Sequence, residues 1–221
     1  MSDEQPRSKA DAYLELLHNR GVEYLFGNAG TDFGPLIDAI ARRAQAGEPS
    51  PKPVTVTHEV TAMAMAHGYA MVSGKTPAIM VHTVAGTANA IGGLINANRA
   101  QVPMLFTAGR TPLTEGDALG ARDLHIHWAQ ESYDQGGMVR EWVKWDYELR
   151  SGSDLAGVID RAMAIAESEP KGPVYLTLPR EVLAEPHDGS PVDGSPSMRA
   201  GKTMAAAVEL AAAAEDLIRA S

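Results

Sequence analysis

Short runs rich in β-branched and aromatic residues alternate with longer runs of helical periodicity through most of this sequence. Strands are typical of the first kind of run and helices of the second, so the alternation predicts parallel strands joined by crossover helices. We expect helices at residues 10–19, 35–44, 60–72, 87–99 and 155–167, and strands at residues 23–26, 54–57, 77–82, 103–107 and 174–178. The expected fold is therefore α/β, with three layers (α/β/α) and a mostly parallel sheet.

The alternation covers residues 10–185, an ordinary length for one domain. Residues 1–9 are polar and are expected to form a flexible N-terminus. Residues 186–201 are rich in Pro, Gly, Ser and Asp, which is typical of a linker. An alanine-rich helix is expected at residues 202–221. Because one helix cannot form a core alone, it must dock on the domain, bind another chain or begin a further domain.

The composition argues against several classes of protein. A formal net charge of -9 makes a nucleic-acid or anionic-membrane surface a poor expectation. The lack of cysteine excludes disulfides, zinc–thiolate sites and thiol nucleophiles. No apolar run reaches the roughly 18 residues that a membrane span needs, and residues 1–9 are unlike a secretory signal. We therefore expect a cytoplasmic protein.

Glu59 stands at the junction between the strand expected at 54–57 and an apolar helix that we expect to be buried. Parallel sheets bind ligands at the carboxyl ends of their strands, where residues 30–31, 82–86 and 109–110 are also expected. A carboxylate buried at this edge needs a partner or a proton. A functional acid and a glutamate stabilised by the helix dipole explain the pattern about equally well.

Three blocks of sequence, supported by two later stretches, carry a resemblance to a known family. They resemble the N-terminal, pyrimidine-binding domain of thiamine-diphosphate-dependent enzymes of the benzoylformate decarboxylase and acetolactate synthase-like family. Within that family the benzoylformate decarboxylases are the most similar, although Ala29 replaces the usual proline and Thr31 stands where serine is common. The blocks are residues 21–31, 58–75 and 82–109, and the later stretches are residues 143–145 and 172–179.

The resemblance implies that Glu59 is a catalytic and cofactor-binding residue. In this family one glutamate holds a proton against N1′ of the cofactor's aminopyrimidine, so that the 4′-imino group can take the C2 proton. Glu59 matches that glutamate, and we expect its apolar surroundings to raise the pKa of the carboxyl toward neutrality. The cofactor implied is thiamine diphosphate with Mg²⁺.

The other candidate site residues follow from the same resemblance. His82 matches a histidine that contacts substrate or relays protons, although a strand-end histidine bonded to backbone is an equal alternative. His58 is expected to orient the loop beside the substrate, and Thr31 to lie near the substrate carboxylate or to cap the helix that begins near Pro35. Gly30, Gly86, Thr87 and Asn89 complete the expected cofactor-binding set, Gly86 by allowing close backbone approach.

Two other signals are weak. Residues 27–34 follow a strand but fail the G-x-G-x-x-G spacing of dinucleotide sites, because Ala29 occupies the second glycine position. His125 and His127, with Asp123, could bind a metal if they shared a strand face, but such pairs are commonly polar surface. We expect no metal ligand on this chain.

The family's second cofactor domain carries Gly-Asp-Gly, which binds Mg²⁺ and through it the diphosphate, and this sequence has no Gly-Asp-Gly. The resemblance therefore predicts a 2-oxo acid decarboxylase or carboligase, a lyase active only with a diphosphate-binding domain from another chain in an oligomer. The chain is expected to be either a subunit of a split enzyme or a truncated product. The alternatives are an acetolactate-synthase-like acyl transferase subunit, for which FAD stays open, and a non-catalytic regulatory subunit that kept the fold.

Overall fold

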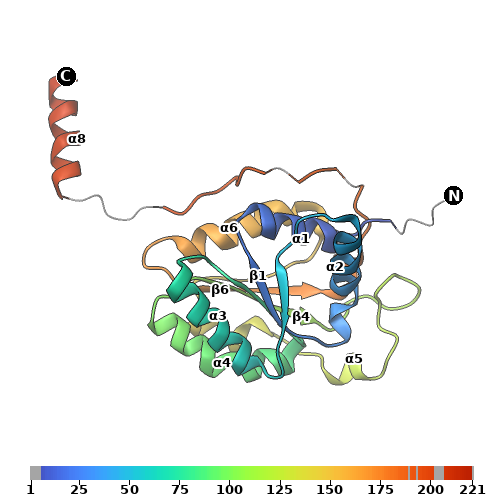
Figure 1. The fold of residues 1–221 in the computed structure, drawn as a ribbon. Helices are drawn as coiled ribbons and strands as arrows, with labels where there is room; N and C mark the ends of the chain where they lie inside the picture. Colours follow the sequence, from blue (N-terminus) through green and yellow to red (C-terminus); the bar gives the residue numbers. More distant parts are fainter. Residues whose placement is uncertain (1–5, 189, 193, 202–206, 221) are drawn as a thin grey trace.

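The computed structural model describes residues 6–188, 190–192, 194–201 and 207–220 (Figure 1). In chain order its elements are α1 (Lys9–Asn19), β1 (Tyr24–Asn28), the 3-10 helix η1 (Thr31–Phe33), α2 (Gly34–Ala46), β2 (Lys52–Thr55), α3 (Glu59–Ser73), β3 (Ala78–Val81), α4 (Thr83–Arg99), β4 (Met104–Arg110), α5 (Ile126–Ala129), η2 (Gly136–Met138), η3 (Arg140–Trp142), β5 (Asp146–Glu148), η4 (Gly152–Asp154), α6 (Leu155–Glu167), β6 (Pro173–Pro179), α7 (Arg180–Ala184) and α8 (Ala207–Ala220).

The strands form one parallel sheet of six in the order β2-β1-β3-β4-β6-β5. Figure 1 shows α1, α2 and α6 on one side of the sheet and α3 and α4 on the other. The α/β fold with three layers is thus confirmed. The strand order reverses beside β1, since β2 follows on one side and β3 on the other. Sheets of this kind bind ligands at the carboxyl ends of the strands at such a reversal.

The core lies on both faces of the central strands. Every residue of β3, β4 and β6 is buried, as expected for parallel strands covered by helices on both sides. Leu14 and Leu17 of α1 pack into the cluster on one face. On the other face the rings of Phe106 and Tyr175 meet with their centroids 5.1 Å apart. This packing fixes the strand ends from which the candidate site is built.

Three local expectations differ from the structure. The sixth strand, β5, was not expected, because it has only three residues, two of them acidic, and pairs with β6 alone. The helix α7 directly after β6 was also missed. Residues 126–129 form the short helix α5 instead of the strand considered for the two histidines.

The expectation that residues 60–72 form a buried helix is wrong for this chain. One face of α3 packs against the sheet and α4 through Ala62, Met63, Ala66 and Ala70. The opposite face is open to solvent in the described part of the chain, and its exposed apolar side chains are Val60 (46% exposed), Met65 (43%), Met71 (69%) and Val72 (91%). We call these four residues the outer α3 face.

The described part of the expected linker, 186–188, 190–192 and 194–201, contains no helix and is bonded to the domain. The Ser197 amide donates to Asp160 Oδ2 on α6 (2.6 Å), and the Val192 amide donates to Glu15 Oε1 on α1 (3.1 Å). Figure 1 shows α8 apart from the sheet and its covering helices. Residues 1–5 of the expected N-terminus and residues 202–206 and 221 of the expected C-terminal helix lie outside the described residues. Within the described ranges, no helix has the length and apolar character to cross a membrane.

Candidate active site

Glu59 is the first residue of α3 and follows β2 by three residues. Its side chain is almost fully buried, with 5% of the residue exposed. Asn28, the last residue of β1, donates from Nδ2 to Glu59 Oε1 (2.9 Å), and Asn89 on α4 donates from Nδ2 to Oε2 (3.1 Å). Three separate elements therefore hold this carboxylate at the carboxyl end of the sheet.

The hydrogen bonds decide the ionisation of Glu59 in this structure. Burial alone would raise the pKa of the carboxyl, but bonds from its own backbone N–H, Asn28 and Asn89 outweigh burial and hold the pKa below its usual value. The expectation that the apolar surroundings raise this pKa is wrong for the chain as described. Hydrogen-bond donors aimed at a carboxylate stabilise the charged form more than these apolar neighbours disfavour it.

Gly86 on α4 gives the Glu59 carboxylate its space. A Cβ added at Gly86 would lie 2.9 Å from Val81 Cβ and 3.3 Å from Glu59 Oε1. Both distances are tighter than ordinary packing, so a larger residue would displace the strand end or the carboxylate. The structure thus brings Gly86 and Asn89 to Glu59, and their predicted contact with the cofactor stays a prediction.

His58 is the N-cap residue of α3. Its Nδ1 accepts a hydrogen bond from the Val60 amide (3.2 Å) and lies 3.8 Å from Glu59 Oε2. Its side chain is 55% exposed. The observed contact is a helix cap, and the predicted contact of His58 with a substrate stays a prediction.

His82 follows β3 and occupies the N-cap position of α4 without a side-chain capping bond. Its Nδ1 lies 2.6 Å from Oδ1 of Asp32, an almost fully buried residue of η1. The pKa of His82 is raised, chiefly by this hydrogen bond, while burial opposes the rise and the Asp32 charge adds to it. A strand-end histidine bonded to backbone was the alternative, and the observed partner is instead a carboxylate.

Gly30 and Thr31 lie directly after β1. A Cβ at Gly30 would meet the His82 ring at 2.1 Å, so this glycine lets the imidazole cross the end of β1. Thr31 is exposed and begins η1. The N-cap of α2 is Phe33, so the alternative that Thr31 caps that helix is wrong. Its predicted place near a substrate carboxylate stays a prediction.

Thr87 lies away from the open crevice. It is fully buried, and its hydroxyl donates to Thr83 O (2.8 Å) and meets the Tyr175 hydroxyl (2.9 Å). The Gln135 amide donates to the same hydroxyls and to Gly109 O. These bonds give Thr87 a packing role, and its predicted contact with the cofactor stays a prediction.

Sequence reasoning missed several residues of this site. Asn28 lay inside the recognised block but was not proposed as a Glu59 partner, although its place at a strand end was a usable signal. Asp32 carried no such signal, because only the fold turns it toward His82. Gln135 lies in a segment without clear periodicity, and its amide joins Thr87 to β4 and β6.

The weak metal signal has no geometric support in the described ranges, where no group of three or more potential ligands occurs. His127 is buried on α5, and its Nδ1 lies within bonding distance of the Asp123 and Leu124 amides (3.3 and 3.4 Å). Burial lowers the pKa of His127. The imidazole therefore binds the backbone of the turn that precedes its own short helix.

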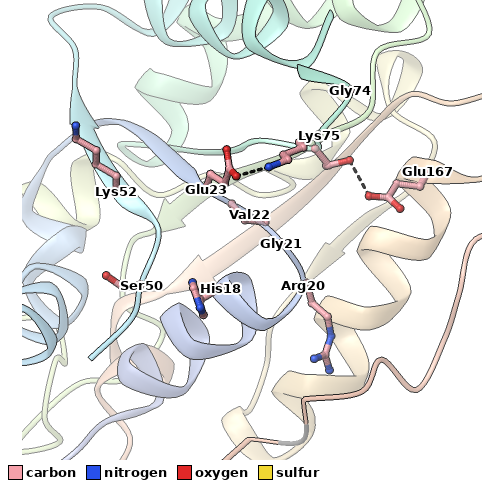
Figure 2. Close-up of a pocket in the computed structure, with 11 residues that line it drawn as sticks. His18, Arg20, Gly21, Val22, Glu23, Ser50, Lys52, Gly74, Lys75 and Glu167 are labelled. Carbon is pink, nitrogen blue, oxygen red and sulfur yellow. Dashed lines mark hydrogen bonds and ion pairs between the residues drawn. The ribbon is translucent and has the colours of Figure 1, made fainter. Parts of the chain in front are cut away.

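A groove with room for a ligand lies elsewhere (Figure 2). It has a volume of about 550 Å³ and is lined by residues that precede β1, β2 and β3, together with the end of α6. It thus opens at the amino ends of the strands, opposite Glu59. Figure 2 shows Lys75 paired with Glu23 inside it. Glu59, Asn28 and Asn89 lie at the other edge of the sheet, so this groove is separate from the candidate site.

Comparison with known proteins gives one family. Residues 7–138 match the family model described as thiamine pyrophosphate enzyme, N-terminal TPP binding domain. A benzoylformate decarboxylase from Pseudomonas aeruginosa is 27% identical over 175 residues, which is 79% of this chain and 30% of that protein. An acetolactate synthase from Arthrospira platensis is 32% identical over 192 residues, covering 87% of this chain and 31% of that protein.

A solved structure agrees with these relatives. The benzoylformate decarboxylase of Polynucleobacter necessarius superposes with a TM-score of 0.71 at 27% identity, covering 87% of this chain and 33% of that one. The chain thus spans about 30% of the length of the curated relatives that it matches.

Proposed function

This chain belongs to the family of N-terminal TPP-binding domains of thiamine pyrophosphate enzymes, and we propose that it is the pyrimidine-binding part of a 2-oxo acid decarboxylase or carboligase. In this proposal Glu59 activates the cofactor through N1′ of its aminopyrimidine. The observation that carries the proposal is the Glu59 carboxylate, buried at a strand-order reversal and held by Asn28 and Asn89. A glutamate with only a structural role does not need to be buried at this position and held by two amide side chains.

The residues present fit an aminopyrimidine. Gly86 lacks the Cβ that would crowd the carboxylate, so a flat ring can approach the backbone at the start of α4. Asn89 bonds the carboxylate through a partly exposed contact, and its amide can also meet a polar ring. Gly30 keeps the opposite wall of the crevice low. When bound, thiamine diphosphate supplies an electron sink for negative charge at a substrate carbonyl carbon.

Glu59 has to hold a proton at its carboxyl to serve N1′, whereas its pKa is lowered in the chain as described. We explain this difference by the exposure of α3 to solvent in the free chain. Cover by a second domain would exclude water from the helix start, which penalises the charged carboxylate and raises its pKa. The acid would then form only in the assembled enzyme.

The outer α3 face supports such an assembly. Between Val60 and Ser73 the helix carries no Asp, Glu, Lys or Arg, and four of its large apolar residues are exposed. An exposed apolar patch of this kind typically marks an interface. Because Val60 adjoins Glu59, we propose that the occupant is the diphosphate-binding domain, which would also bring the Mg²⁺ ligands.

The substrate side of the proposal rests on Thr31 and His82. Both lie at the carboxyl end of the sheet, one exposed and one partly exposed, so both can face a 2-oxo acid. A cationic imidazole suits the carboxylate of such a substrate, and the contact of His82 with Asp32 favours the cation. Location in the cytoplasm stays a prediction of the sequence.

Co-expression with a chain that carries Gly-Asp-Gly tests the function. The assembled complex, supplied with thiamine diphosphate and Mg²⁺, should release CO₂ from benzoylformate or pyruvate. Glu59→Gln should abolish turnover and leave assembly intact. An acyl transferase would also release one CO₂, but it would join the remaining two-carbon acyl group to a second pyruvate as a 2-hydroxy-2-acyl acid, whereas a decarboxylase would release an aldehyde. A complex that assembles but acts on neither acid would favour the non-catalytic alternative.

A further inference from the structure

Asp32 and His82 form a close pair that joins two elements of the site. His82 Nδ1 and Asp32 Oδ1 are 2.6 Å apart, although the residues are 50 positions apart in the sequence. Asp32 lies in η1 after β1, and His82 occupies the N-cap position of α4 after β3. The aspartate side chain is 3% exposed and the histidine side chain 21% exposed. The pair therefore runs from the buried interior to the crevice.

Two glycines make room for this pair. A Cβ at Gly30 would lie 2.1 Å from His82 Nδ1, and a Cβ at Gly109 would lie 1.5 Å from Asp32 Oδ2. Neither distance is possible for real atoms, so no other residue fits at either position unless the pair moves. Gly30 follows β1 by two residues and Gly109 is the last residue but one of β4, and these are the two strands that flank β3. The backbone is thus shaped around the carboxylate and the imidazole.

The Asp32 carboxylate is enclosed where water has no access. The small cavity that it shares with Thr83, Arg110 and Thr111 has no room for a water molecule. Asp32 Oδ2 has no hydrogen-bond partner among the described residues. A buried carboxylate without water needs a positive or donating partner, since an unpaired buried charge is strongly unfavourable. His82 is the partner that the geometry supplies.

We propose that Asp32 is a positioning residue that fixes the Nδ1–H tautomer of His82 and holds the ring toward the crevice. Nδ1 is then committed to the aspartate, and Nε2 is the nitrogen that can meet a substrate or exchange a proton. The use of Nε2 in a reaction rests on the proposed function, whereas the tautomer and its cause do not. This is the logic by which a carboxylate orients a catalytic histidine elsewhere.

Other groups also affect the pKa of the His82 imidazole, and the effect of Asp32 has to be measured against theirs. Glu59 on α3 and Gln130 after α5 also raise the pKa of His82, and His127 on α5 interacts electrostatically with His82. Asp32 has the largest effect on the pKa of His82, which it raises. Removal of the Asp32 charge should therefore be visible against the remaining groups.

Imidazole ¹⁵N NMR of the free chain tests the proposal without any activity. Wild-type His82 should titrate above the histidine model value of 6.5 and show the Nδ1–H tautomer when neutral. In Asp32→Asn its titration should move to lower pH and its tautomer should change or mix. Asp123→Asn is the matched control, because Asp123 contacts His127 and Arg180 instead.

An unchanged pKa and tautomer of His82 in Asp32→Asn would overturn the proposal. If Asp32→Asn does not fold, Gly109→Ser, which crowds Asp32 Oδ2 from behind, should shift the same His82 signals, and unchanged signals would again overturn it. In the assembled enzyme Asp32→Asn should move the pH profile of kcat to lower pH. Altered NMR signals with no catalytic activity in the wild-type complex would refute the proposed function and leave the pairing intact.

Discussion

At the scale of single residues, three glycines of the site leave space for larger polar side chains. Gly86 leaves space for Glu59, Gly30 for His82 and Gly109 for Asp32. None of the three needs glycine for a left-handed backbone, because their φ values are not in that region. Their shared property is the missing Cβ, which lets polar side chains cross the strand ends.

Gly86→Ala should destabilise the chain by about 1–3 kcal/mol, because the new Cβ would overpack Val81 and the Glu59 carboxylate. Gly92→Ala on the same helix is the control, since its Cβ would meet nothing within 4 Å. That substitution should stabilise the chain by about 0.5–1 kcal/mol through helix propensity. Urea denaturation measures both, and equal effects would contradict the crowding at Gly86.

The Asp32–His82 pair should give the chain a defined dependence of stability on pH. The pKa of His82 is raised on folding, so its stabilising contribution is complete below about 6.5 and is lost as pH rises through the folded value. The difference in unfolding free energy between wild type and Asp32→Asn should therefore shrink as pH increases above 6.5. A difference that stays constant from pH 6 to pH 9, which brackets that window, would contradict the pair.

At the scale of elements, the sequence predicts most of the sheet and misses its edge. Strands β3, β4 and β6 follow from largely apolar runs, since parallel strands are buried on both faces. β5 is too short and too acidic to carry such a signal, and only pairing with β6 makes it a strand. Glu59 was predictable from its junction, whereas Asp32 was not, because its partner is 50 residues away.

The C-terminal end of α4 holds a conformation that its sequence does not favour. Gln101 follows the helix with a φ of 54°, in the left-handed region where a Cβ is strained. Its amide donates to Asn98 O, and the Val102 amide donates to Ala97 O, which closes the helix end. Glycine is the usual residue at this place.

Gln101→Gly should therefore stabilise the chain by about 1 kcal/mol, measured as a rise in Tm and in the urea midpoint. Ala100→Gly is the matched control, because Ala100 has a φ of -85° and gains nothing from the lost Cβ. A Gln101→Gly variant that is no more stable than wild type would show that the strain lies elsewhere.

At the scale of the whole molecule, the helices on the two sides of the sheet differ in how far the rest of the chain covers them. The helices α1 and α6 are covered in part by the bonded segment around Val192 and Ser197, whereas the outer α3 face lies exposed in the described chain. Glu59 lies at one end of that face. We therefore expect the cofactor site to be completed when this surface is covered.

Met65→Glu should weaken association with a chain that carries Gly-Asp-Gly, because it places a charge in the middle of the outer α3 face. The Tm of the free chain should be nearly unchanged, since Met65 is 43% exposed. Leu119→Glu is the control, because Leu119 is 75% exposed and lies in the loop after β4. Analytical ultracentrifugation of the mixed chains measures both, and equal association of the two variants would contradict docking on α3.

The central claim is that the Glu59 carboxyl meets the aminopyrimidine of the cofactor. Titration of thiamine diphosphate and Mg²⁺ into a complex of the ¹⁵N-labelled chain with a chain that carries Gly-Asp-Gly, followed by amide NMR, tests it most directly, with Glu59→Gln beside wild type. We predict shifts confined to residues around Asn28, Glu59, Gly86 and Asn89, and a weaker or absent response in the variant. Shifts centred elsewhere, or an undiminished response in Glu59→Gln, would contradict the claim.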